Sequence, residues 1–598
     1  MNAAPQRRMV WVCAFTTFIF TLLSTRLVFV QVNQHDSYVD KATANQGERQ
    51  RLPARRGVIT DRRGEALAQN VPVQTLVLDA TLVKNPQLLS ELLASSLNLP
   101  QAPILERLTR IRPSTDPEKK ELSPYIVLKK NLGAHLVEEI KSRLTEAKAL
   151  RGVSFEVEGN RLYPNNEMLC HVVGFVNNES KGVDGVEMTM DSFLSGHDGS
   201  RDIVRTRRGE TVEVKSSSDH PPLAGYNVSL TVDMGLQNIV EQELDAAIKE
   251  LRPKGATVVM LDPKTGEILA LANRPNFNLN VQEGVKEINR MNLAVSAQVE
   301  PGSTFKIVTV AAVLDQSLCN PDSMINCENG FYQWCNLKDH HSYADLSVND
   351  ILVHSSNIGT AKLAMRLGDQ KFFDYIHRFG FGVQTGVSLP GEIRGVIHPP
   401  HTWSKISITR MPIGQEVAAT PIQIVAAMAT IANGGTLMIP QIVREITDEN
   451  GTVITAFPPR QVRQAVSKKV ADQVRLALIE VASKKGTAKN AQVPGFVVAG
   501  KTGTAQKLEK GLYSHDKHVC SFVGFMPAND PAFVMLVLID EAKSTRPDLD
   551  VGGLVAAPVF SRIAARAAKY LDLTPSYEDA QSGIIAKQGK SGGRNPHP

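Results

Sequence analysis

The stretch VEPGSTFKIVTVAAVLD, residues 299–315, decides how the second half of this chain is interpreted. Apolar residues recur at helical spacing after the breaker Pro301-Gly302, which predicts a helix with Ser303 in its first turn. Residues three positions apart share a helix face, so the Ser303 hydroxyl and the Lys306 amine can meet. A lysine among apolar side chains loses hydration, and its neutral amine can then take a proton from the serine. The pair is therefore a candidate nucleophile and base.

A single S-x-x-K pattern carries little weight on its own. Ser303 could be a simple helix cap, and Lys306 could be a solvated surface residue. The chain contains a second match at Ser514-His515-Asp516-Lys517, which shows how easily the pattern arises. Other motifs have to decide between these interpretations.

Two S-x-N patterns follow within residues 345–368. Ser347 opens an apolar run and has Asp350 three positions later, so it predicts a helix start with a capping box. Ser355 and Asn357 fall between two apolar runs, where a helix ends and side chains can point into a cleft. We therefore expect Ser355 and Asn357 to be the functional pair.

The stretch FVVAGKTGTAQ, residues 496–506, places Lys501-Thr502-Gly503-Thr504 at the end of a predicted strand. A similar Lys264-Thr265-Gly266 lies in a hairpin turn, where turn chemistry explains it. A glycine in a strand lets another backbone approach closely, which suits a peptide laid along a sheet edge. A lysine with two hydroxyls beside it suits a carboxylate.

The N-terminus predicts a membrane anchor. Arg7 and Arg8 precede an apolar stretch at residues 9–32 that only Arg26 interrupts, and about 20 apolar residues span a bilayer. No small-residue cleavage site follows, which favours an uncleaved anchor over a removable signal peptide, although the latter stays open. Basic residues before the span place residues 1–8 in the cytoplasm and the bulk of the chain outside.

Composition excludes several classes of protein. The net charge is +5 and the basic residues are scattered, so the composition gives no sign of a nucleic-acid-binding surface. Six cysteines are too few for a disulfide scaffold; Cys327 and Cys335 are close enough for one small bridge, and two separate thiols fit equally well. No Cys/His spacing suggests zinc, His340 and His341 look like ordinary loop residues, and we expect no metal or cofactor.

The order of elements predicts a multidomain α+β protein. RRGVITDRRGEALA, residues 55–68, predicts a strand, a turn around Asp61 and a second strand. Later, two strands, a helical block, three strands and a final amphipathic helix indicate one antiparallel sheet with helices on both faces. The predicted segments are the anchor at 9–32, an irregular mixed α/β region at 33–222 that ends in a linker at 215–225, a second domain at 223–570, and a disordered tail at 571–598.

Three motifs follow one another along the chain in the order S-x-x-K, S-x-N and K-T-G. Together they are the active-site set of penicillin-interacting enzymes. The segments GVDGVE, LTVDMGLQ, MPIGQEVAATPIQ and SFVGFMPA add to the pattern. The chain resembles the class B penicillin-binding proteins, which are bacterial peptidoglycan D,D-transpeptidases, and among them the cell-division (FtsI-like) type.

This resemblance implies a pedestal (dimerisation-type) domain over 33–222 and a β-lactamase-like transpeptidase domain over 223–570. It implies that a serine attacks the penultimate D-Ala carbonyl of a stem pentapeptide, releases the last D-Ala, and passes the acyl group to an acceptor amine of a neighbouring stem peptide. The implied roles are nucleophile for Ser303, base for Lys306, proton relay for Ser355, and substrate binding for Asn357, Lys501, Thr502, Gly503 and Thr504.

The resemblance also implies partners and a location. β-Lactams would be covalent inhibitors. An FtsW-like glycan polymerase and other membrane proteins of the divisome would be partners in the bacterial inner membrane, with septal cell wall as the product.

Other functions remain open from the sequence. One is the elongation type of class B transpeptidase. A D,D-carboxypeptidase or β-lactamase-type hydrolase is disfavoured by the long pedestal and the anchor. A penicillin-sensing receptor is disfavoured by the single anchor without a cytoplasmic domain, and an inactive scaffold by the complete motif set.

Overall fold

The computed structural model describes residues 4–38, 47–112, 121–205, 211–214, 220–509, 512–543 and 551–575. The chain divides into two compact units, Met1–Arg55 with Gly196–Gly225, and Arg56–Ser195 with Tyr226–Pro598. Most of the predicted tail, residues 576–598, lies outside the described residues, as do residues 215–219 of the predicted linker.

The first unit contains the apolar N-terminal helix. Helix α1 (Ala4–Val28) continues into a π-helical turn, η1 (Phe29–Asn33). Within it, the 26 residues Arg8–Asn33 are long and apolar enough to cross a membrane, which fits a single-pass anchor. The helix begins inside the predicted tail at residues 1–8. The unit also holds an antiparallel sheet of β1 (Gly47–Leu52), β8 (Gly199–Arg205) and β9 (Thr211–Val214).

The second unit starts with the predicted strand, turn and strand. The Asp61 carboxylate accepts hydrogen bonds from the backbone N–H groups of Arg63 and Glu65, which closes the turn as expected for this residue type. The two strands belong to a seven-stranded sheet whose other strands come from distant parts of the sequence. The order of strands across the sheet is β19 (Val453–Ala456), β18 (Val443–Thr447), β10 (Asn227–Leu230), β2 (Ile59–Thr60), β3 (Ala66–Leu78) and β6 (Ile126–Leu132). The seventh strand, β7 (Val153–Leu162), also pairs with β3.

Helices pack on the β3 and β6 part of this sheet around their own apolar core. Asn85 begins the first of them, because its side chain accepts a hydrogen bond from the Leu88 N–H. The elements of this region are α3 (Pro86–Leu97), α4 (Gln101–Thr109), β4 (Ile111–Arg112), β5 (Glu121–Leu122) and α5 (Ala134–Glu146).

A buried ion-pair network lies where the sequence showed only turns and short apolar runs. Glu187, in the short helix α7 (Gly185–Thr189) between α6 (Cys170–Val173) and α8 (Asp191–Leu194), is fully buried. Its two oxygens each accept a hydrogen bond of 2.7 Å, one from Arg56 Nε and one from Arg161 Nε. A buried carboxylate is tolerated only when it is paired in this way.

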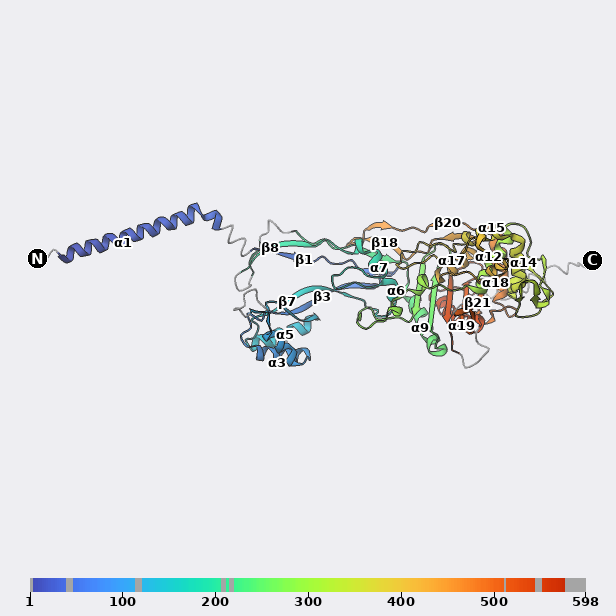
Figure 1. Ribbon diagram of the computed structural model, residues 1–598, viewed down its shortest axis with the longest axis horizontal. Coiled ribbons are helices and arrows are strands. Elements are labelled where there is room, and N and C mark those ends of the chain that lie inside the picture. Colours follow the sequence, from blue (N-terminus) through green and yellow to red (C-terminus); the bar gives the residue numbers. More distant parts are fainter. Residues whose placement is uncertain are drawn as a thin grey trace, which may run out of the picture. The chain divides into compact units, whose positions relative to one another are not determined.

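The antiparallel sheet predicted for the second domain is present. Its five strands follow the order β12 (Ile268–Arg274), β11 (Gly255–Leu261), β23 (Phe533–Asp540), β22 (Leu512–Met526) and β21 (Ala499–Glu509). Every residue of β11 and β12 is buried, so both faces of the sheet are covered. Helices α9 (Met234–Leu251) and α19 (Gly552–Tyr570) lie side by side and contact the sheet, and α17 (Pro421–Ala432) also packs on its middle strands (Figure 1). β21 is an edge strand.

The helical block between β12 and β21 is interrupted by small two-stranded sheets, which the sequence did not indicate. Its helices are α10 (Glu287–Arg290), α11 (Leu293–Ser296), α12 (Lys306–Asp315), α13 (Val348–Val353), α14 (Asn357–Leu367), α15 (Asp369–Arg378), α16 (Ser407–Arg410) and α18 (Lys468–Val481). Its strands are β13 (Met324–Asn326), β14 (Phe331–Tyr332), β15 (Leu337–Lys338), β16 (Asp345–Ser347), β17 (Thr436–Met438) and β20 (Gln461–Gln464).

Replacing Glu187 by Gln should lower the free energy of unfolding by about 3–5 kcal/mol, because two buried guanidinium groups lose the carboxylate they share, while Arg56 keeps Asp191 as its acidic partner. Urea unfolding of the detergent-solubilised chain, followed by circular dichroism, measures the loss. The matched control is Glu139→Gln, which removes an exposed partner of Arg143 and should change stability by less than about 0.5 kcal/mol. Equal effects of the two substitutions would contradict a structural role for the network.

Candidate active site

Ser303 lies in a 3₁₀ turn, η3 (Gly302–Phe305), that leads directly into α12. The predicted helix is therefore present, but its first turn is tighter than an α-helix. In a 3₁₀ turn residues i and i+3 eclipse one another, which keeps Ser303 and Lys306 on one side of the chain. Ser303 is half-buried and lines a cavity.

Two glycines bring this turn against strand β21. Gly302 has φ +55°, and a Cβ there would lie 2.9 Å from the Thr504 carbonyl oxygen. A Cβ on Gly503 would lie 2.3 Å from Ser521 Oγ and 3.0 Å from the Pro301 carbonyl oxygen. Gly503 thus makes room for the turn that carries Ser303. The sequence interpretation, in which it makes room for a bound peptide, stays a prediction.

The sequence suggested that the K-T-G motif lies at the end of a strand. In the structure it lies inside strand β21. Residues 501–504 pair in register with Val523, Phe522, Ser521 and Cys520 of β22, and the strand continues to Glu509. The local sequence did not show this, because the pairing partner is distant in the chain.

The Lys306 amine is completely buried and fully hydrogen-bonded. Its Nζ lies 2.6 Å from the Ser355 carbonyl oxygen, 3.1 Å from Ser355 Oγ and 2.7 Å from Asn357 Oδ1. The S-x-x-K and S-x-N motifs therefore meet at one nitrogen. Burial, and then the positive charge of Lys501, lower the pKa of Lys306 well below its ordinary value, while Asp339 opposes the shift.

Ser355 and Asn357 occupy the junction of α13 and α14, as predicted. Ser347 caps α13 by accepting a hydrogen bond from the Asp350 N–H, which confirms that the first S-x-N match is a helix start. Ser355 has φ +58°, an unfavourable conformation for a residue with a Cβ. Ser356 then caps α14 by accepting a hydrogen bond from the Gly359 N–H at 2.9 Å.

Asp339 holds this junction in place, and sequence reasoning missed it. Its carboxylate accepts hydrogen bonds from Ser356 Oγ at 2.6 Å and from the backbone N–H groups of Asn357 and Ile358. A negative charge at a helix N-terminus is favourable. No local signal marks this aspartate, because the residues it binds lie 17 to 19 positions later.

The three polar residues of the K-T-G-T segment have different surroundings. Lys501 is fully buried, and burial lowers its pKa to about 7. Thr502 is also buried, with its hydroxyl 3.2 Å from that of Thr487. Thr504 lines the cavity and accepts a hydrogen bond from the Gly552 N–H at 3.0 Å.

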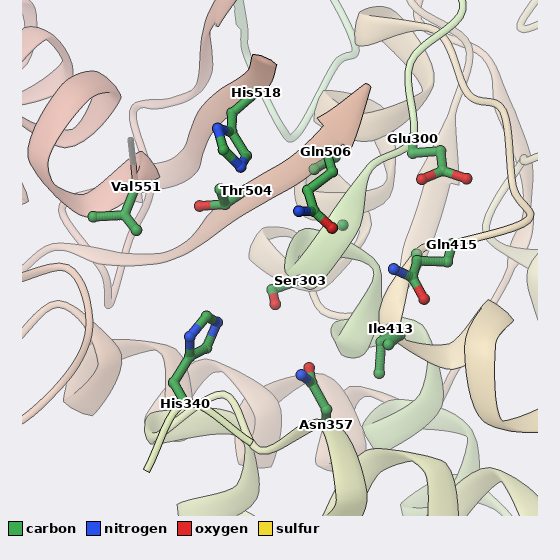
Figure 2. A pocket seen from close by; sticks show the side chains of 13 residues that line it. Glu300, Ser303, His340, Asn357, Ile413, Gln415, Thr504, Gln506, His518 and Val551 are labelled. Carbon is green, nitrogen blue, oxygen red and sulfur yellow. The ribbon is translucent and has the colours of Figure 1, made fainter. Parts of the chain in front are cut away.

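One cavity of about 520 Å³ collects residues from all three motifs. Ser303 lies at its centre, with Asn357 below and Thr504 beside it (Figure 2). Lys306, Ser355 and Lys501 are buried and are not among the lining residues. The other lining residues are Glu300, Gly302, His340, Ile413, Gly414, Gln415, Ala505, Gln506, His518 and Val551.

His340 is an exposed loop residue, as expected from the sequence, and it also lines this cavity. Partial loss of hydration, and then the nearby Lys306, lower the pKa of its ring. The histidines gave no metal signal in the sequence, and the described residues contain no group of three or more acidic, His or Cys side chains that could hold a metal ion.

The remaining sequence hypotheses are resolved by the fold. Ser514 and Lys517 of the second S-x-x-K match lie on strand β22, so the helical spacing that would bring the two side chains together is absent. Of the two alternatives left open for Cys327 and Cys335, the structure has the two separate thiols and not the bridge. The Cys327 sulfur lies 3.6 Å from Ser356 Oγ, while Cys335 packs in a separate small apolar cluster.

Two family models match the chain. Residues 256–565 match the penicillin binding protein transpeptidase domain, and residues 51–230 match the penicillin-binding protein dimerisation domain. The chain belongs to the class B penicillin-binding proteins. As a member of the FtsI-like type of this family, it is a serine-type peptidoglycan D,D-transpeptidase that binds peptidoglycan peptides and β-lactams.

Individual relatives agree with this assignment over nearly their whole length. Stage V sporulation protein D of Bacillus subtilis is 33% identical over 96% of this chain and 87% of its own length. Peptidoglycan D,D-transpeptidase FtsI of Escherichia coli is 28% identical over 98% of this chain and 96% of its own. The crystal structure of penicillin-binding protein 3 from Mycobacterium tuberculosis in complex with aztreonam matches with a TM-score of 0.67 and 26% identity, covering 88% of this chain and 98% of that one.

Replacing Lys306 by Arg should lower the rate constant of acylation by penicillin by a factor of about 10² to 10⁴, the usual contribution of a general base. Guanidinium stays protonated and cannot accept a proton. In the unaltered enzyme acylation should rise with pH as the neutral amine forms, and the lowered pKa of Lys306 places this rise below that of a free lysine. Stopped-flow acylation across pH measures both effects.

Lys306→Met is the second variant, since it removes the amine without adding a charge. Thermal unfolding shows whether either variant is folded. Near-normal acylation by folded Lys306→Arg would show that the Lys306 amine takes no part in the reaction.

Proposed function

We propose that the chain cross-links stem peptides of septal peptidoglycan through an acyl-enzyme on Ser303. The observation that carries the proposal is the buried Lys306 amine, held by Ser355 and Asn357 one turn from a serine that lines the cavity. A neutral amine at this place can take the Ser303 proton as its Oγ attacks the penultimate D-Ala carbonyl.

The donor peptide is proposed to lie along the free edge of β21. An extended peptide can add to an exposed sheet edge through backbone hydrogen bonds. Its terminal carboxylate would then reach the Lys501 end, with Thr502, Gly503 and Thr504 forming that part of the strand. The N–H groups of Ser303 and Thr504 are the candidate oxyanion hole, a contribution of about 3–4 kcal/mol per donor.

The collapse of the tetrahedral intermediate releases D-Ala. The proton on Lys306 passes through Ser355 to the leaving amine, while Asn357 binds the peptide amide. An acceptor amine then attacks the Ser303 ester and forms the cross-link. A hydrolase would use water at this step, so product analysis with an added amine separates the two activities.

A division role rests on the FtsI-like type of the sequence and on relatives such as FtsI of Escherichia coli. In this role the anchor leaves residues 1–8 in the cytoplasm and places the pedestal, 33–222, and the transpeptidase domain, 223–570, outside the inner membrane. The proposed membrane partners are an FtsW-like glycan polymerase and other divisome proteins.

Incubation with penicillin should give a long-lived adduct on the peptide that contains EPGSTFK. A β-lactam has a strained amide and a carboxylate placed like those of D-Ala-D-Ala, so it acylates the same serine. Ser303→Ala should abolish the adduct with little change in thermal stability, because the N-cap residue of α12 is Phe305 and not Ser303. Mass mapping of the digest locates the adduct.

Ser355 and Ser514 are internal controls in the same digest. An adduct on either of them, or none on any residue at saturating drug, would overturn the assignment of Ser303.

Depletion of the protein in its own cells should produce filaments, because septal cross-linking fails while elongation continues. Microscopy of depleted cells measures this directly. Round, swollen cells would instead assign the chain to the elongation type.

A further inference from the structure

One side of the cavity carries a carboxylate that has no role in the proposed reaction with the donor peptide. Among the described lining residues, Glu300 carries the one carboxylate. It lies on the same side of the cavity as Gln415, while His340 and Val551 lie on the opposite side of Ser303 (Figure 2).

Glu300 is held firmly by one oxygen. Its Oε1 accepts a hydrogen bond of 3.0 Å from Tyr513 Oη and another of 3.0 Å from the Glu416 N–H. Both bonds go to Oε1, which leaves Oε2 without a protein partner in the part of the chain that the structure describes. The side chain is thus oriented, and one oxygen is free to accept a hydrogen bond from a ligand.

We propose that Glu300 binds the ammonium group of the acceptor stem peptide; this inference rests on the proposed acyl-enzyme on Ser303. The acceptor of a transpeptidase is an amine, which is a cation in neutral water, so its subsite needs a negative charge. The donor brings a carboxylate to the Lys501 part of β21, and the two substrates are therefore sorted by charge.

Glu300 also accepts the proton that the acceptor must lose. The ammonium transfers one proton to the Glu300 carboxylate, and the neutral nitrogen attacks the ester carbon of the Ser303 acyl-enzyme. The C–N bond forms, the C–Oγ bond breaks, and the second amine proton returns through Ser355 and Lys306 to Ser303 Oγ. Loss of hydration raises the pKa of the Glu300 carboxyl, which makes it a better proton acceptor than an exposed glutamate.

The test separates acylation from acyl transfer in the full-length enzyme. Glu300→Gln keeps an oxygen for Tyr513 and the Glu416 N–H but removes the charge. Acylation by a fluorescent penicillin should stay within about twofold of the unaltered rate. With an N-acyl-D-alanine thioester as donor, aminolysis by Nα-acetyl-lysine amide relative to hydrolysis should fall about tenfold or more, the loss of one charge-assisted hydrogen bond.

Hydroxylamine is the matched acceptor, because it is uncharged at neutral pH. With hydroxylamine, the ratio of acyl transfer to hydrolysis in Glu300→Gln should stay within about twofold of the ratio in the unaltered enzyme. Glu300→Asp, which keeps the charge, should recover part of the preference for the cationic amine. Glu449→Gln is the control variant, since this exposed carboxylate does not line the cavity, and it should leave both partitions unchanged.

Three results would overturn the inference: an equal fall for both acceptors, an unchanged partition to the cationic amine, or a large loss of acylation in both Glu300 variants. Each would mean that Glu300 shapes the Ser303 turn or does nothing in acyl transfer. Failure of penicillin to acylate Ser303 in the unaltered enzyme would instead reject the proposed function itself.

Discussion

Water has no access to the Lys306 amine, so the protein itself must supply all of its hydrogen-bond partners. Three oxygens do so, two from Ser355 and one from Asn357. The carbonyl and amide oxygens can only accept, whereas the Ser355 hydroxyl can also donate to the lone pair of a neutral amine. The hydrogen-bond partners can therefore serve the uncharged form of the lysine as well as the charged form, and they also fix where the S-x-N residues must lie.

The hydrogen-bond partners of the Lys306 amine depend in turn on other parts of the fold. Ser355 can present both of its oxygens only from an unfavourable backbone conformation, and Asp339 holds the start of α14 next to it. On the other side, Gly302 and Gly503 allow the Ser303 turn to touch β21. The buried amine thus depends on a helix junction, a loop aspartate and a sheet edge that are far apart in sequence.

Local sequence signals predicted the elements well and the contacts between elements poorly. The hairpin around Lys264-Thr265-Gly266 and the choice of Ser355 over Ser347 were predictable, because turn and capping residues act within a few positions. Asp339 and Glu300 were not, because their partners Ser356 and Tyr513 are brought to them only by the fold. The state of Cys327 and Cys335 stayed open for the same reason: spacing alone does not show that Cys327 faces Ser356 rather than Cys335.

The seven-stranded sheet crosses the boundary between the two family segments. β10 pairs in parallel with β2 from one segment and antiparallel with β18 from the other. A register is specific to the strands that form it, and a slip of one residue turns every side chain to the wrong face. Exchange of gene segments between relatives at this boundary would therefore succeed only when both parents share the β10–β18 register, so the two halves are expected to be inherited together.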